Sequence, residues 1–216
     1  ALFLFDASGT NVLDRVLFGP QLPDRSIARA GTGGTWFLGQ PSLNGPTVTV
    51  PVGGGAGVRI NEWLAFGGAS NPDDLIELYN TGSLPADLGG YYMTDNPLGF
   101  PNMHRIPDLS FIGGGGFMVL TADGDIDNPD HVNFSLDADQ GEIGFFSPQV
   151  TAIDCIYYGP QRRGVPVGRC PDGANSIRSG AVPTFGFANL CPVPPPPPQM
   201  INVMPVTNTW RYLTGA

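Results

Sequence analysis

The sequence contains no lysine, so all ten of its basic residues are arginines, and only 13% of its residues are charged. Its 19 Asp and Glu residues leave a net charge of −9. Because affinity for nucleic acid depends on clustered Lys and Arg that neutralise phosphates, we expect no nucleic-acid partner. No apolar run reaches the roughly 18 residues that a membrane-spanning helix needs, so we also expect no membrane insertion.

Residues that usually carry catalysis are scarce as well. The chain has two histidines, His104 and His131, and three cysteines, Cys155, Cys170 and Cys191. None of them has the spacing of zinc ligands, and the usual nucleophile-elbow, metalloprotease and phosphate-loop patterns are missing. Without a convergent nucleophile, base or metal set, we expect that the chain is not an enzyme and needs no cofactor, apart from a calcium ion considered below.

Glycine and proline are abundant, with 31 and 23 residues, and they separate short apolar runs. Such punctuation is typical of the turns of an all-β protein. Short strands at this spacing predict a β-sandwich. The expected strands lie near residues 58–64, 74–80, 88–94, 103–106, 116–121, 132–136, 142–147, 152–158 and 165–170.

An internal repeat links the start of the chain to its second half. Six residues recur 140 positions later, which predicts that residues 1–46 are the C-terminal half of a domain that is complete in residues 58–190. Half a sandwich cannot cover its own apolar face, so missing upstream chain, a neighbouring molecule or the second domain must complete it. The recurring residues are Asp14, Gly19, Pro20, Gln21, Arg29 and Gly33, followed by Asp154, Gly159, Pro160, Gln161, Arg169 and Gly173.

Three further segments complete the expected organisation. Residues 47–57 form a linker with a glycine run. Residues 191–199 are a proline-rich spacer, since consecutive prolines adopt stiff polyproline II. Residues 200–216 are expected to begin a further β module or an assembly segment.

Several of the short segments together resemble the lamin tail domain in its bacterial extracellular form. The resemblance covers residues 57–190 in full and residues 1–46 as a C-terminal half copy. It implies an immunoglobulin-like β-sandwich, tandem and partly incomplete, that is not itself catalytic. The segments that carry it include Ile60-Asn-Glu62, Asp74-Leu-Ile-Glu-Leu-Tyr-Asn80, Gly90-Tyr-Tyr-Met-Thr-Asp95, Arg105-Ile-Pro107 and Gly168-Arg-Cys-Pro-Asp-Gly173.

This resemblance favours one function and leaves a second open. The first is a non-enzymatic structural or adhesive module of a large bacterial surface, secreted or fibre-forming protein, which pairs strands with itself or with flanking domains of the same polypeptide. The alternative is an accessory polymer- or carbohydrate-binding module of an exported hydrolase or nuclease. Its contacts would be Tyr91, Tyr92, Trp63 and Phe100, unless these aromatics fill the core.

One acidic loop could bind calcium. Asp123, Asp125, Asp127 and Asp130 stand close together in the sequence. Calcium takes six to eight oxygen ligands, and a loop with alternating aspartates can supply several of them. The other interpretation is a solvated loop between two strands.

Two recurring pairs and the cysteines are expected to be structural. If their strands form hairpins, Asp154 with Arg169 and Asp14 with Arg29 are ion pairs that fix strand register. For Cys155 and Cys170, the loss of cysteine at both equivalent positions of residues 1–46 favours a disulfide between them. A disulfide between Cys170 and Cys191 remains the alternative.

Overall fold

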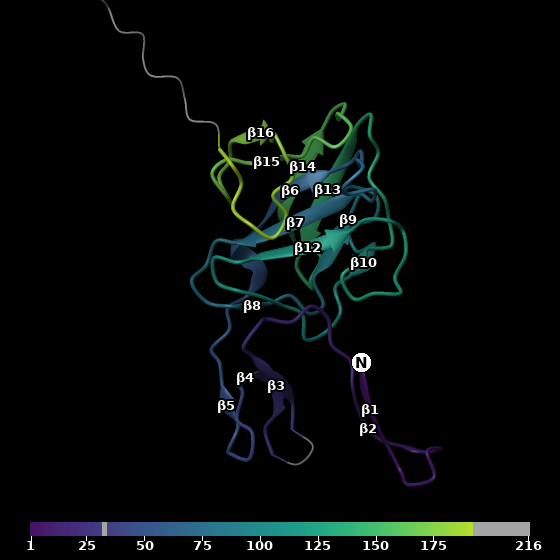
Figure 1. The fold of residues 1–216 in the computed structure, drawn as a ribbon, viewed down its shortest axis with the longest axis vertical. Helices are drawn as coiled ribbons and strands as arrows, with labels where there is room; N and C mark the ends of the chain where they lie inside the picture. The colour runs from purple at the N-terminus through teal and green to yellow at the C-terminus, as the bar shows by residue number, and fades with distance from the viewer. Residues whose placement is uncertain (32–33, 192–216) are drawn as a thin grey trace, which may run out of the picture.

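The computed structural model describes residues 1–31 and 34–191 of the chain (Figure 1). Within these residues the regular structure is antiparallel strands and one 3-10 turn, Gly55–Gly57. No helix in this part is long and apolar enough to cross a membrane. The expected proline-rich spacer beyond Cys191 and the expected module at residues 200–216 lie outside the described residues.

The larger part of the fold is a sandwich of two main sheets. The first sheet has five strands, in the order β12, β7, β6, β15 and β16. Its strand β6 carries an irregularity around Asn61, so that Ile60 faces Leu78 and Glu62 faces Glu77 on β7. The five strands are β12 (Phe117–Thr121), β7 (Leu75–Asn80), β6 (Val58–Leu64), β15 (Val167–Arg169) and β16 (Ile177–Ser179).

The second sheet has four strands, in the order β10, β9, β13 and β14, and a separate short pair, β8 with β11, lies beside the sandwich. The glycine run before β12 makes a turn, in which Gly115 has a φ of 63° that a side chain would strain. The strands are β10 (His104–Arg105), β9 (Tyr92–Thr94), β13 (Gly141–Phe146), β14 (Ala152–Tyr158), β8 (Ala86–Asp87) and β11 (Phe111–Ile112).

The core lies between the two main sheets. Trp63 and Leu78 contribute from the first sheet, and Met93 and Phe145 contribute from the second. All four side chains are buried, and every member of this core cluster belongs to residues 58–158. The sandwich therefore has a core of its own, which does not depend on residues 1–46.

One expected strand is absent from the structure. Residues 132–136 form only one isolated bridge, from Ser135 to Asp123, and His131 just before them bridges to Thr121. Val132, Phe134 and Leu136 are nevertheless buried, as an alternating pattern predicts. In place of a regular ladder, the segment bonds to side chains, with the Leu136 N–H donating to the carboxylate of Asp74 at 3.0 Å and the Asn133 N–H donating to His104 Nδ1 at 3.3 Å.

The N-terminal residues form two smaller sheets outside the sandwich (Figure 1). The first is the β1–β2 hairpin, and the second has the order β3, β4 and β5. No strand of either sheet joins a ladder of the sandwich sheets. The strands are β1 (Leu2–Phe5), β2 (Val12–Val16), β3 (Ser26–Arg29), β4 (Trp36–Gln40) and β5 (Val48–Thr49).

A short loop, Gly19-Pro20-Gln21, joins this N-terminal part to the sandwich. The N–H of Gly19 donates to the carbonyl of Asp108 at 3.1 Å, and the side-chain amide of Gln21 donates to the carbonyl of Leu109 at 2.6 Å. In return the N–H of Phe111 donates to the carbonyl of Pro20 at 2.9 Å. We call this contact the joint.

Candidate functional site

The β1–β2 hairpin repeats the strand register of the β13–β14 hairpin. Leu4 faces Asp14 in the first hairpin, and Phe145 faces Asp154 in the second. In both hairpins the register shifts immediately after this pair, which marks a bulge at the same place. The sequence repeat therefore extends to the pairing of the backbone.

The next two strands repeat in the same way. Arg29 on β3 faces Trp36 on β4, and Arg169 on β15 faces Ile177 on β16. The two preceding pairs of each ladder also correspond. Strands β1 to β4 thus have the arrangement of β13 to β16.

In the sandwich, an ion pair holds a third strand in place. Arg169 on β15 donates through Nη2 to both carboxylate oxygens of Asp154 on β14, at 2.9 Å each. Arg169 Nε donates to the carbonyl of Ile60 at 2.7 Å, and the Ile60 N–H donates to Asp154 at 2.9 Å. The pair therefore binds both backbone groups of one residue on strand β6.

This arrangement corrects the expected geometry of the pair. The sequence predicted that Asp154 and Arg169 face each other across a single hairpin. Strand β14 instead pairs with β13 in the four-stranded sheet, and β15 pairs with β6 and β16 in the five-stranded sheet. The ion pair links the two sheets of the sandwich and does not fix the register of one ladder.

The equivalent ion pair at the N-terminus contacts no third strand in the part of the chain that the structure describes. Arg29 Nη1 and Nη2 donate to Asp14 at 3.0 and 3.1 Å, and these bonds hold the pKa of the Asp14 carboxyl below its usual value. The guanidinium also lies 4.2 Å above the ring centre of Trp36. Arg29 Nε is buried and has no hydrogen-bond partner among the described residues, whereas Arg169 Nε binds a carbonyl.

Two strand edges of residues 1–46 are open in the described part of the chain. Strand β13 lies between β9 and β14, but its equivalent β1 pairs only with β2. Strand β15 lies between β6 and β16, but its equivalent β3 pairs only with β4. We call these two edges, with the apolar side chains of β1 and β2, the open face.

The side chains of the open face differ from their equivalents mainly in exposure. Leu2 and Leu4 on β1 are 67% and 58% exposed. Their equivalents on β13, Ile143 and Phe145, are both 0% exposed. Apolar strand positions that are fully buried in the sandwich are thus left at the surface in β1.

The comparison with protein-family models matches residues 51–160 to the Lamin Tail Domain. The chain belongs to the lamin tail domain family. A lamin tail domain is an immunoglobulin-like β-sandwich, so the predicted family and fold are confirmed for this domain. Neither the comparison with curated proteins nor the comparison with solved structures finds a match. In the structure, strands β15 and β16 extend the sandwich beyond the matched range.

The lamin tail domain also contains a buried acidic pair that the sequence did not single out as a site. Glu62 and Glu77 face each other on β6 and β7, and both are buried. The Thr184 N–H donates to Glu62 at 3.1 Å, and the Gly186 N–H donates to Glu77 at 2.6 Å. Burial raises the pKa of both carboxyls, and it raises the pKa of Glu77 to about 7.

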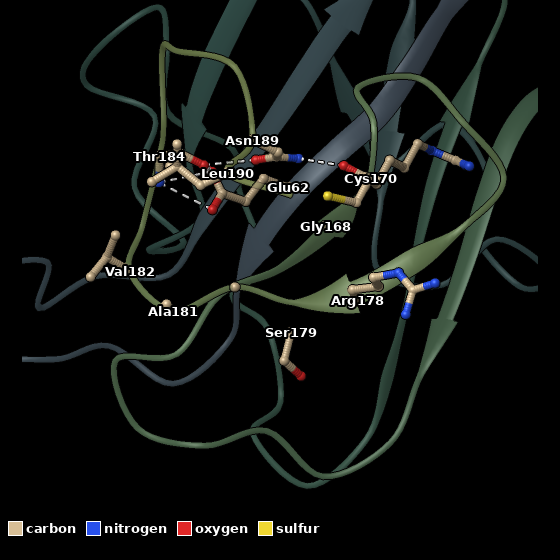
Figure 2. A pocket seen from close by; sticks show the side chains of 12 residues that line it. Glu62, Gly168, Cys170, Arg178, Ser179, Ala181, Val182, Thr184, Asn189 and Leu190 are labelled. Atoms are coloured by element: carbon tan, nitrogen blue, oxygen red, sulfur yellow. Dashed lines mark hydrogen bonds between the residues drawn. The ribbon is translucent and has the colours of Figure 1, made fainter. Parts of the chain in front are cut away.

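These carboxylates hold the last described segment of the chain against the outer face of the five-stranded sheet. Figure 2 shows Thr184 and Asn189 of this segment, residues 183–190, beside Glu62. The hydroxyl of Thr184 donates to Glu62 at 3.0 Å, and Asn189 Nδ2 donates to the carbonyl of Arg169 at 2.8 Å. We call residues 183–190 the strap. The acidic pair serves as a set of acceptors for the strap.

The disulfide at the end of the strap corrects one expectation. Cys170 pairs with Cys191, with a Cα–Cα distance of 5.5 Å, and not with Cys155. The favoured pairing assumed that Cys155 and Cys170 lie on adjacent strands. Cys155 instead faces Gly144 on β13 in the other sheet, where it is a free, partly buried thiol whose pKa is raised mainly by burial.

The acidic loop does not gather its carboxylates. Asp125 Oδ1 accepts the N–H groups of Ile126 at 2.6 Å and Asp127 at 3.0 Å, and Asp123 lies 2.8 Å from His131 Nδ1. No group of three or more His, Cys, Asp and Glu side chains within residues 1–31 and 34–191 could hold a metal ion. The candidate calcium set of Asp123, Asp125, Asp127 and Asp130 is therefore not assembled in the described structure, where two of these side chains bind local groups.

The four aromatics of the binding alternative do not share one surface. Trp63 is 1% exposed and belongs to the core. Tyr91 stacks on Phe145 with ring centres 5.5 Å apart, and its hydroxyl accepts the N–H of Gly55 at 2.8 Å. Tyr92 is partly buried and Phe100 is exposed. These positions match the interpretation that most of the aromatics are structural.

Proposed function

We propose that this chain is a non-enzymatic, extracellular structural or adhesive module of a large bacterial surface, secreted or fibre-forming protein. Residues 1–46 are, in this proposal, the C-terminal half of a second lamin tail domain. The complete domain is a rigid unit, and the open face associates with protein by strand pairing. The observation that carries the proposal is the repeated register of β1 to β4 together with the exposure of Leu2 and Leu4.

Two features support the location and the absence of catalysis in this proposal. The disulfide between Cys170 and Cys191 suits an oxidising compartment outside the cytoplasm, where such bonds persist. The buried carboxylates of Glu62 and Glu77 already accept hydrogen bonds from the chain's own backbone. Both carboxylates are thus engaged in holding the strap, and of the two it is Glu62 that also lines the pocket shown in Figure 2.

No specific observation favours the alternative of a polymer- or carbohydrate-binding module of an exported hydrolase or nuclease. Such a module needs exposed aromatic rings that act together. Trp63 lies in the core and Tyr91 packs on Phe145, so these two rings support the fold instead.

The test is the mass of the chain in solution. Light scattering coupled to size-exclusion chromatography should show a mass that rises with concentration over about a hundredfold range, because association follows mass action. The variant Leu4→Asp, on the exposed strand β1, should abolish this rise. Leu98→Asp is the matched control, because Leu98 is exposed but lies on the complete domain. A monomeric parent chain throughout the range would contradict strand-paired assembly.

A further inference from the structure

We propose that the open face of residues 1–46 is a docking site for the N-terminal half of a lamin tail domain, a segment equivalent to residues 57–141. This inference rests on the proposed function, because it names the partner of the strand pairing. The complete domain shows which strands such a partner must supply.

The partner must supply two strands at once. In the complete domain β6 lies beside β15, where Trp63 faces Val167, and β9 lies beside β13, where Met93 faces Phe145. Strands β3 and β1 present the equivalent edges. A half domain that carries strands like β6 and β9 fits both edges, whereas a single extended peptide would fill one and leave the other open.

The buried nitrogen of Arg29 shows where one of these strands binds. Arg169 Nε donates to the Ile60 carbonyl on β6, but the equivalent Arg29 Nε has no partner among residues 1–31 and 34–191. Buried polar groups without a partner are rare in native structures, because each loses hydrogen bonds that water would provide. Arg29 is already held by two bonds to Asp14. A backbone carbonyl at the position of Ile60 would satisfy the free Nε.

The apolar side chains of the open face require a partner with an apolar surface. Ile143 and Phe145, the equivalents of Leu2 and Leu4, belong to the core cluster together with Ile60. The partner must therefore present an apolar face, like that of β6, to β1 and β2. Burying this surface would remove apolar area from water, which favours docking.

A second copy of this chain can pair its own open edges with these edges, but it offers no free strand equivalent to β6. Its own β6 is already paired on both edges, with β7 and with β15. The repeat favours a separate half domain instead, because Leu4 corresponds to Phe145 and β1 therefore corresponds to β13, the first strand after residues 57–140. An added segment equivalent to residues 57–141 can thus be joined directly to β1, and docking within one polypeptide gains from high effective concentration.

The experiment restores this half domain. A chimera carries an added copy of residues 57–141 directly ahead of Ala1 of the full chain. Hydrogen exchange followed by mass spectrometry should show that the amides of residues 2–5 and 26–29 exchange slower by about tenfold or more than in the parent chain, since paired strands open less often. Exchange in residues 143–146 and 167–169 should not change, and light scattering should show a monomer.

Two substitutions in the chimera test the role of Arg29. Arg29→Met should reverse the slowed exchange of residues 26–29, and Asp14→Asn should reverse part of it. The matched control is Arg25→Met, because the Arg25 side chain is exposed and donates only to the neighbouring Asp24 carbonyl. If Arg25→Met changed the exchange of residues 26–29 as much as Arg29→Met does, the proposed role of Arg29 would be contradicted.

The outcomes separate this inference from the proposed function. Unchanged exchange of residues 2–5 and 26–29 in the chimera overturns the inference, even if the parent chain associates. A chimera that still associates through β1 identifies a second copy as the partner and also overturns it. Slowed exchange in a monomeric chimera supports the inference. This holds also if the parent chain is itself monomeric, in which case only the proposed assembly between molecules is contradicted.

Discussion

The side chain of Arg169 is hydrogen-bonded to the backbone of Ile60, 109 residues away in the sequence, with Nε 2.7 Å from the carbonyl oxygen. Asp154 completes the contact by accepting the Ile60 N–H. The ion pair thus positions the central strand β6 of the lamin tail domain. Its role depends on two bonds to the backbone as well as on opposite charge.

Removing Arg169 should destabilise the domain strongly. Arg169→Met leaves the carboxylate of Asp154 without its charged partner, and breaking a buried pair on one side costs about 3–5 kcal/mol. Urea unfolding should show this loss in the free energy of unfolding. The control is Arg105→Ala, since Arg105 and Asp108 are 51% and 68% exposed, and such pairs contribute about 1 kcal/mol or less. Similar losses for both variants would contradict the central role of Arg169.

The buried Glu77 should make stability depend on pH. Its pKa is raised from 4.5 to about 7 in the folded domain, so folding favours the protonated form. This contribution is fully present below pH 4.5 and is lost as pH rises through about 7. The loss is on the order of 3 kcal/mol, from about 1.4 kcal/mol per pKa unit.

Unfolding by urea at a series of pH values measures this effect. The difference in free energy between the parent chain and Glu77→Gln should change across the interval from pH 4.5 to about 7. The control is Gln140→Ala, an exposed side chain that does not titrate, for which the same difference should stay constant. A constant difference for Glu77→Gln would show that Glu77 does not titrate in this interval.

The disulfide should stabilise the domain by closing the loop between Cys170 and Cys191, which are 21 positions apart in the sequence. Replacing both cysteines with serine should lower the free energy of unfolding by about 3 kcal/mol, mainly through the entropy of the unfolded chain. Peptide mapping without reduction should recover Cys170 linked to Cys191 and Cys155 as an alkylated thiol. A peptide that links Cys155 to Cys170 would instead support the pairing favoured by the sequence.

The joint should be sensitive to one glycine. A Cβ added at Gly19 would lie 1.9 Å from the Ser110 hydroxyl oxygen, so Gly19→Val should detach residues 1–46 from the sandwich. Small-angle scattering should then show a larger radius of gyration. The matched control is Gly159→Val, at the equivalent residue, where a Cβ meets nothing within 4 Å. An unchanged radius for Gly19→Val would mean that the joint tolerates the added side chain.

The internal repeat allowed two contacts to be predicted from the sequence. Asp14 and Arg29 recur together as Asp154 and Arg169, and both pairs form ion pairs in the structure. The bond from Arg169 to Ile60 could not be predicted, because it depends on which strand lies beside β15. The sequence pattern predicts strands well, but not the order in which distant strands pair.

Two further residues show why the candidate site was only partly predictable. Glu62 and Glu77 belong to apolar strands, and an acidic residue in such a strand is usually expected to face solvent. They are buried because the strap covers the outer face of the sheet, and it supplies the N–H groups of Thr184 and Gly186. The cysteine prediction failed for a related reason, since it assumed that strands consecutive in sequence pair with each other.

The joint has a consequence for how such modules could be stacked. Its loop occurs again as Gly159-Pro160-Gln161, in which the Gln161 amide donates to the Gly159 carbonyl as the Gln21 amide does to Gly19. A module that carries this loop and also the turn at Asp108–Phe111 has both parts of a head-to-tail connector. Successive modules joined in this way would follow one screw operation, with a fixed rise and rotation per domain.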